Sequence, residues 1–155
     1  MQRPHPPIMI GPGGNRMLAL AARHADILGV SPAPITAGVL ATNASASLPD
    51  SVATKVYVIR QAAACRFSQL EPSMVVSPVV TQHRRSAAAD FARMRAWSSV
   101  SVEEVLTMPS ALIGTVGEIA EHVQACRERY GLSYLIVSDR DTDALAAVIG
   151  QLREM

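Results

Sequence analysis

Residues 8–28, IMIGPGGNRMLALAARHADIL, constrain the fold more than any other part of the chain. They begin with a short apolar run, residues 8–10, of the kind found in strands that are buried on both faces. Residues 11–14 (the glycine loop) must form a turn, and Asn15 is predicted to cap the helix that follows. A second apolar run, residues 25–30, comes next. Two strands joined by a helix predict a parallel pair with a right-handed crossover.

The rest of the chain repeats this alternation of apolar runs and helices. Residues 31–50 carry almost no charge and are predicted to form a long loop on the active-site side. Residues 74–80 predict a third strand, in which Pro78 indicates an irregularity, and residues 134–137 predict a fourth.

Helices are predicted from apolar spacing and from their end signals. Capping boxes begin at Ser101 and Thr115, and Gly131 is predicted to end the helix that starts at Thr115. The other predicted helices cover residues 51–67, 86–96 and 141–152.

This order of elements predicts an α/β fold with about four parallel strands and flanking helices. A closed (β/α)₈ barrel needs eight strands and typically ~250 residues, whereas this chain has 155. The chain is therefore expected to be a single domain, either an open sheet or a partial (half) TIM barrel.

Composition excludes some classes of function. A net charge of +1 with 17% charged residues gives no basic surface for nucleic acid, and no apolar stretch reaches the ~20 residues of a membrane helix. Cys65 and Cys126 lie far apart without metal-type spacing, so both are expected to be reduced thiols. These features predict a cytoplasmic protein that binds neither nucleic acid nor membrane.

The glycine loop can bind a phosphate. Small residues after a parallel strand let backbone N–H groups approach an anion, and the helix start adds its free N–H groups and partial positive charge. Candidate ligands are the backbone groups of Gly11, Gly13, Gly14, Asn15 and Arg16. The loop is neither a Walker loop nor a full dinucleotide fingerprint. From the pattern alone, phosphate binding and a simple tight turn remain equal alternatives.

Three colinear stretches resemble luciferase-like flavin or deazaflavin oxidoreductases, and in particular the actinobacterial branch that uses the deazaflavin coenzyme F420. They are PPIMIGPGGNRMLALAARHADILGV (residues 6–30), KVYVIRQAAACRFSQLE (residues 55–71) and LIGTVGEIAEHVQACRERYGLSYLIVSDRDTDALAAVIGQL (residues 112–152). The resemblance covers nearly the whole chain.

The resemblance implies a TIM barrel in which the glycine loop binds the coenzyme phosphate. Gly13 and Gly14 match the paired glycines of the family. Pro12 stands where a glycine is common and removes one N–H donor. Ala64 and Cys65 replace a Gly-Asp pair, which is expected to be a local turn change.

All three stretches belong to the C-terminal half of such enzymes, so residues 1–155 are expected to correspond to that half. The resemblance then implies part of an oxidoreductase that transfers hydride through F420, with no catalytic residue in this chain. Alternatives are a non-catalytic remnant or phosphate-ligand-binding module, and a fragment of an FMN-dependent monooxygenase. The expected partner is a second copy, in a homodimer, or the missing half of the barrel.

We expect the other polar residues to have structural roles. His24 is expected to make a local hydrogen bond, and Asp26 to hold the start of the second strand. Trp97 is expected to pack in the core. Residues 139–141 follow the last strand at what would be the catalytic face of a barrel, where Asp141 is also a candidate helix cap. Histidine spacing predicts no metal site.

Overall fold

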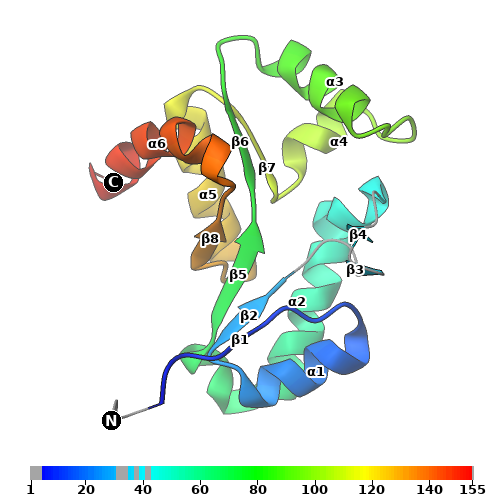
Figure 1. The fold of residues 1–155 in the computed structure, drawn as a ribbon, viewed down its shortest axis with the longest axis vertical. Coiled ribbons are helices and arrows are strands. Elements are labelled where there is room, and N and C mark those ends of the chain that lie inside the picture. The colour runs from blue at the N-terminus through cyan, green and yellow to red at the C-terminus, as the bar shows by residue number, and fades with distance from the viewer. Residues whose placement is uncertain (1–4, 31–34, 37–38, 41–42, 155) are drawn as a thin grey trace.

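Four parallel strands form the central sheet in a computed structural model that describes residues 5–30, 35–36, 39–40 and 43–154. Their order is β1-β2-β5-β8, and Figure 1 shows the helices packed along this sheet. The strands are β1 (Met9–Ile10), β2 (Ile27–Gly29), β5 (Glu71–Val75) and β8 (Tyr134–Ile136). All three pairings are parallel. The predicted α/β fold with about four parallel strands and flanking helices is confirmed.

Four helices bury one face of this sheet: α1 (Asn15–His24), α2 (Pro49–Ala63), α5 (Val116–Tyr130) and α6 (Thr142–Glu154). Side chains alternate along each strand, so Leu28 and Met74 point toward the helices and are almost completely buried. The main core gathers apolar residues from the sheet and from all four helices. None of the described helices is long and apolar enough to cross a membrane.

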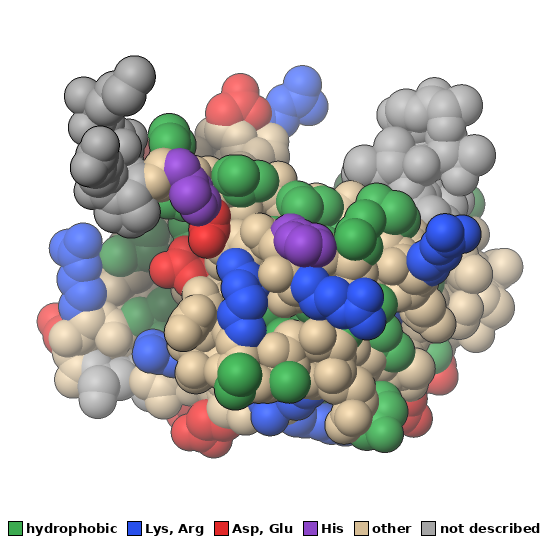
Figure 2. Space-filling view, turned by 90° about the horizontal axis from the view of Figure 1, so that it is seen from below, with side chains coloured by type: hydrophobic (Ala, Val, Ile, Leu, Met, Phe, Trp, Pro, Cys, Tyr) green, Lys and Arg blue, Asp and Glu red, His purple; other side chains and the backbone are tan. Residues whose placement is uncertain are grey.

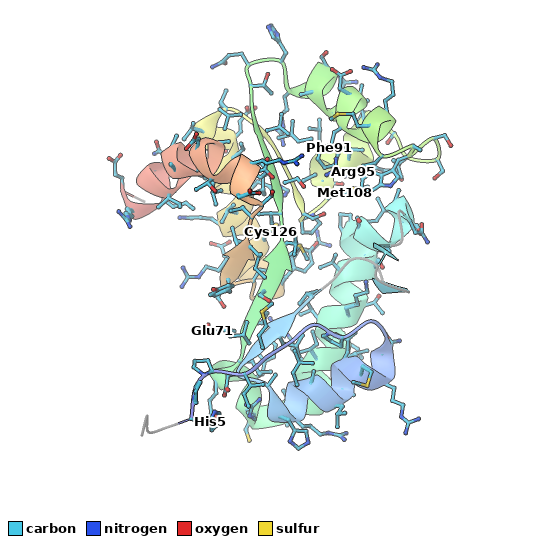
Figure 3. The ribbon with its side chains drawn as sticks, in the orientation of Figure 1. His5, Glu71, Phe91, Arg95, Met108 and Cys126 are labelled. Atoms are coloured by element: carbon cyan, nitrogen blue, oxygen red, sulfur yellow. The ribbon has the colours of Figure 1, made fainter. Side chains whose placement is uncertain are left out.

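A second, smaller core lies beyond the carboxyl end of β5. The chain continues past Val76 into β6 (Ser77–Val80), which pairs in parallel with β7 (Ala111–Gly114). Between them come α3 (Arg84–Met94) and α4 (Val102–Thr107). We call residues 77–114 the lobe; Figure 3 shows Phe91, Arg95 and Met108 together in it. Phe91 and Met108 belong to the lobe's own buried cluster.

The predicted helix ends are found at three positions. Ser101 and Thr115 each accept a hydrogen bond from the backbone N–H three residues later, and the glutamate there reaches back to the cap, so both capping boxes are confirmed. Gly131 ends α5 in the left-handed conformation at φ 75°, as predicted for a C-terminal glycine.

Several predicted boundaries are wrong. Asn15 is the first residue of α1, and Gly14 occupies the cap position without a side-chain bond. The strand predicted at residues 74–80 starts earlier, at Glu71, and it breaks at Val76 instead of at Pro78. Strand β7 was not expected.

The segment predicted as a loop, residues 31–50, lies partly outside the described residues. Where it is described, it contains the antiparallel pair β3 (Ile35–Thr36) and β4 (Val39–Leu40), then the 3₁₀ helix η1 (Ala44–Ser47). Helix α2 begins at Pro49, since proline is favourable in the first turn of a helix. It ends at Ala63 and continues as the 3₁₀ helix η2 (Ala64–Gln69) up to β5.

Candidate functional site

The glycine loop connects the carboxyl end of β1 to the start of α1. Gly11, Gly13 and Gly14 are exposed, whereas Pro12 is buried and anchors the loop. Figure 2 shows the molecule from below, where basic and histidine side chains lie beside exposed hydrophobic ones. The loop is therefore open to solvent at the carboxyl end of a parallel strand, which is where ligands bind in α/β proteins.

The N-terminus of α1 has free donors. The N–H of Leu18 donates to the Gly14 carbonyl at 2.8 Å, which is the first bond of the helix. The N–H groups of Asn15, Arg16 and Met17 precede that bond and have no partner among the described residues. By contrast, the capping box of Thr115 occupies the N-terminus of α5. The start of α1 can accept an anion.

The fold does not require a glycine at position 14. Its φ of −154° and ψ of 165° are extended values that any residue adopts. A Cβ built on Gly14, or on Gly11, would meet no atom within 4 Å. Local backbone geometry and packing therefore leave space next to the helix start, and a ligand could use it.

Asp26 has the structural role expected of it. Its Oδ2 accepts a hydrogen bond from the Ile8 N–H at 2.8 Å and so ties the start of β1 to the start of β2. Arg66 holds the same corner, because its guanidinium donates to the carbonyls of Ala22 and Ala25 and lies 3.7 Å from Asp26. These bonds fix the end of α1 and therefore the βαβ unit that presents the glycine loop.

His24 is exposed in the last turn of α1, and no hydrogen bond to it is found in the described part of the chain. The expected local bond is therefore not seen. A basic side chain at this end of a helix still lies favourably against the helix dipole.

The face of the central sheet that points away from the helices is largely apolar and partly uncovered, with Glu71 at the amino end of its strands. We call it the open face; side chains of Met9, Val75 and Tyr134 there are 46%, 57% and 45% exposed. Ser73 shares this face with Val75, since Met74 between them points into the helical core. The Ser73 hydroxyl is fully buried and has no hydrogen-bond partner within the described residues.

The lobe contains a cation that sequence reasoning missed. The Arg95 guanidinium stacks 3.5 Å from the centre of the Phe91 ring and donates to the Ser77 hydroxyl at 3.1 Å. Burial lowers the pKa of Arg95, and the charge of Asp141 opposes that shift. Trp97 packs edge-on against Phe91, as expected of a core residue. Only the folded chain brings these residues together.

Residues after β8 form a turn with no acid–base pair. Asp139–Asp141 is the 3₁₀ helix η3, which Ser138 caps and which leads directly into α6 at Thr142; no hydrogen bond from the Asp141 side chain to the start of α6 is seen among the described residues. In the described ranges, no hydrogen bond or ion pair joins these residues to the glycine loop. A separate groove between α5, β8 and α6 is lined by Val123, Arg127 and Leu152 and contains none of the predicted site residues.

Comparisons with known proteins give the fold. No protein-family model matches the chain, and no curated protein sequence matches it. Among solved structures, monooxygenase RslO1 from Streptomyces bottropensis is similar at a TM-score of 0.55 and 18% identity over 88% of this chain. The long-chain alkane monooxygenase LadA is similar at a TM-score of 0.58 and 15% identity over 96% of this chain. The chain spans 42% and 41% of the length of these two structures.

Proposed function

We propose that this chain is the phosphate-binding part of a luciferase-like oxidoreductase that uses a deazaflavin or a flavin. The observation that carries the proposal is the uncapped, solvent-open start of α1 directly after β1. The N–H groups of Asn15 and Arg16 have no partner there among the residues that the structure describes, and Gly14 leaves room for a phosphate oxygen to approach them. Both solved structures described above are monooxygenases, in keeping with this family.

The proposed cofactor is coenzyme F420, with FMN as the alternative. Both carry a phosphate, and a cradle of backbone N–H groups does not distinguish one phosphate ester from another. The resemblance of the three sequence stretches favours the deazaflavin. The chain's own residues would bind and orient the phosphate end: Gly11, Gly13 and Gly14 through close backbone approach, Asn15 and Arg16 through their N–H groups.

Hydride transfer is proposed for the complete barrel and not for this chain alone. Hydride transfer through a deazaflavin requires a bound ring and a residue positioned to exchange a proton with the substrate. Asp26, the carboxylate of this βαβ unit, is engaged in a structural bond at the start of β1, at the opposite end of that strand from the glycine loop. We therefore expect the purified chain to bind the phosphate group without catalysing turnover.

The test is a fluorescence titration of the chain with F420, FMN and riboflavin, which lacks the phosphate. We expect F420 or FMN to bind measurably more tightly than riboflavin, and inorganic phosphate to compete. Gly14→Val should weaken binding about tenfold or more, since its branched side chain fills the space above the helix start. The fold should survive, because valine is compatible with the extended backbone at this position.

Gly117→Val is the matched control. Gly117 also lies in the first turn of a helix and also has open space around its Cβ position, but the capping box of Thr115 already occupies that helix start. Binding that falls equally in both variants, or in neither, would contradict the proposed site.

A further inference from the structure

We propose that the open face of the central sheet is an interface that a second copy of this chain covers, so that two chains close one parallel barrel. This inference is independent of phosphate binding. It rests on the exposed side chains of one sheet face, on the two sheet edges that have no partner strand among the described residues, and on the number of strands in the sheet.

The open face is apolar where a barrel interior would be. In-register rows run across the sheet: Gly29, Ser73 and Tyr134 form one row, and Val75 and Ile136 form the next. These two rows contain no charged residue, and the exposed Glu71 lies in the row before them, with Met9 and Ile27, at the amino end of the strands. Val75 is 57% exposed and Tyr134 is 45% exposed, whereas the opposite face of the same strands is buried under helices. Native sheets usually protect such a face with charges or a covering element.

Both edges of the sheet lack a neighbour. The order β1-β2-β5-β8 places β1 at one edge and β8 at the other, and neither pairs with a further strand in the part of the chain that the structure describes. Their outer N–H and C=O groups can bond to another strand in parallel.

In a dimer of two copies, one kind of contact pairs the hydrogen-bonding groups of both edge strands. A two-fold axis along the middle of the barrel preserves strand direction, so it places β8 of each copy beside β1 of the other. The four strands of each sheet then make eight, which is the number in a closed parallel barrel filled by its own side chains.

A second copy is the occupant favoured by the size of the sheet. The solved structures of similar fold are more than twice as long as this chain, which matches 42% and 41% of them. The unmatched part of each structure is larger than the matched part, so the piece needed to complete such a barrel is at least as large as this chain. A second chain supplies strands of the required direction and number.

The test is the mass of the full chain by light scattering and by sedimentation over a wide range of concentration. We expect a species of twice 16.5 kDa that dissociates on dilution. Val75→Glu should weaken association at least tenfold, since it places a charge inside the closed barrel. Tyr134→Lys is a second disrupting variant, in case the first does not fold.

Val80→Glu is the matched control. It is the same substitution of a valine that is exposed in a strand, at 43%, but β6 lies outside the central sheet. We expect this variant to remain dimeric.

Hydrogen exchange locates the contact. Backbone amides of β1 and β8 should exchange slowly in the dimer and rapidly in Val75→Glu. The inference is overturned by a monomer at every concentration, by a broad range of larger species, by a dimer that Val75→Glu and Tyr134→Lys leave intact, or by edge amides that exchange rapidly throughout. A dimer that binds no phosphate would refute the proposed function alone.

Discussion

Gly29 in β2 lies directly against the backbone of Gly11 at the start of the glycine loop. A Cβ on Gly29 would approach the Cα of Gly11 to 3.1 Å, a contact that only a shift of the backbone can relieve. The absence of a side chain at Gly29 therefore lets the loop rest on the neighbouring strand. This contact sets the position of the loop relative to the sheet.

Gly29→Ala is expected to destabilise the fold by ~1–3 kcal/mol, since it overpacks a contact between two backbones. Gly14→Ala is the comparison, because its Cβ would enter open space, and it should change stability by less than about 0.5 kcal/mol. Urea unfolding of the two variants measures the difference. Equal stabilities would show that the loop moves away from β2 without cost.

Ala64→Gly is expected to stabilise the protein by about 1 kcal/mol or more. Ala64 has φ 50° and ψ −125°, a conformation that strains any residue with a Cβ. This is the position where the resembling family has glycine. Ala53→Gly, inside α2, should instead cost about 1 kcal/mol, since glycine weakens a helix interior. Thermal unfolding should give shifts of opposite sign.

Arg66→Lys is expected to lower stability by ~1.5–3 kcal/mol. A lysine cannot donate at once to the carbonyls of Ala22 and Ala25, as the forked guanidinium does. Arg85→Lys is the control: that side chain is 72% exposed in its ion pair with Glu103, and only a small change is expected. Chemical denaturation compares them, and similar losses would mean that the Arg66 bonds are not maintained in solution.

Stability should fall with acidity through His122. Its Nε2 lies 3.2 Å from the Met108 carbonyl, and burial lowers the pKa of this imidazole below its ordinary value near 6.5. The unfolded chain therefore binds this proton more readily, so the contribution of His122 is complete above pH about 6.5 and is lost as pH falls below it. Unfolding measured from pH 8 to about 5 should show this loss, and His122→Gln should flatten it.

Ser73→Ala is expected to leave the protein equally stable or to stabilise it by about 1 kcal/mol. The buried hydroxyl has no partner in the described residues, and an unsatisfied polar group costs ~1–3 kcal/mol. Ser47→Ala provides a second buried serine for comparison. A clear loss of stability in Ser73→Ala, measured by thermal unfolding, would indicate that a bound water or another chain satisfies the hydroxyl.

Local signals predicted the βαβ start and the capped helices well. The capping boxes at Ser101 and Thr115 and the glycine at position 131 act within one helical turn, so their residues are adjacent in sequence. The cap of α1 was misplaced by one residue because glycine and asparagine both suit a cap position, and only the backbone conformation distinguishes Gly14 from Asn15.

Tertiary arrangements were beyond the reach of those signals. Strand β7 has four residues, Ala111–Gly114, which is too short for a periodic pattern. The break at Val76 arises because β5 and β6 pair with different neighbours on either side of it. Arg95 reaches Ser77 across 18 positions, and no sequence spacing indicates that contact.

Because β6 pairs with β7 and, within the described residues, with no strand of the central sheet, the lobe can vary in length without changing that sheet. Strands β6 and β7 run parallel, with Ser77 in register with Ala111 and Val80 with Gly114, so the lobe begins at Ser77 and ends at Gly114 at opposite ends of this strand pair. Residues between those points have their own buried cluster. The segment that connects β6 to β7 can thus change in length while the four-stranded sheet keeps its register, which allows this end of the molecule to diversify separately from the glycine loop.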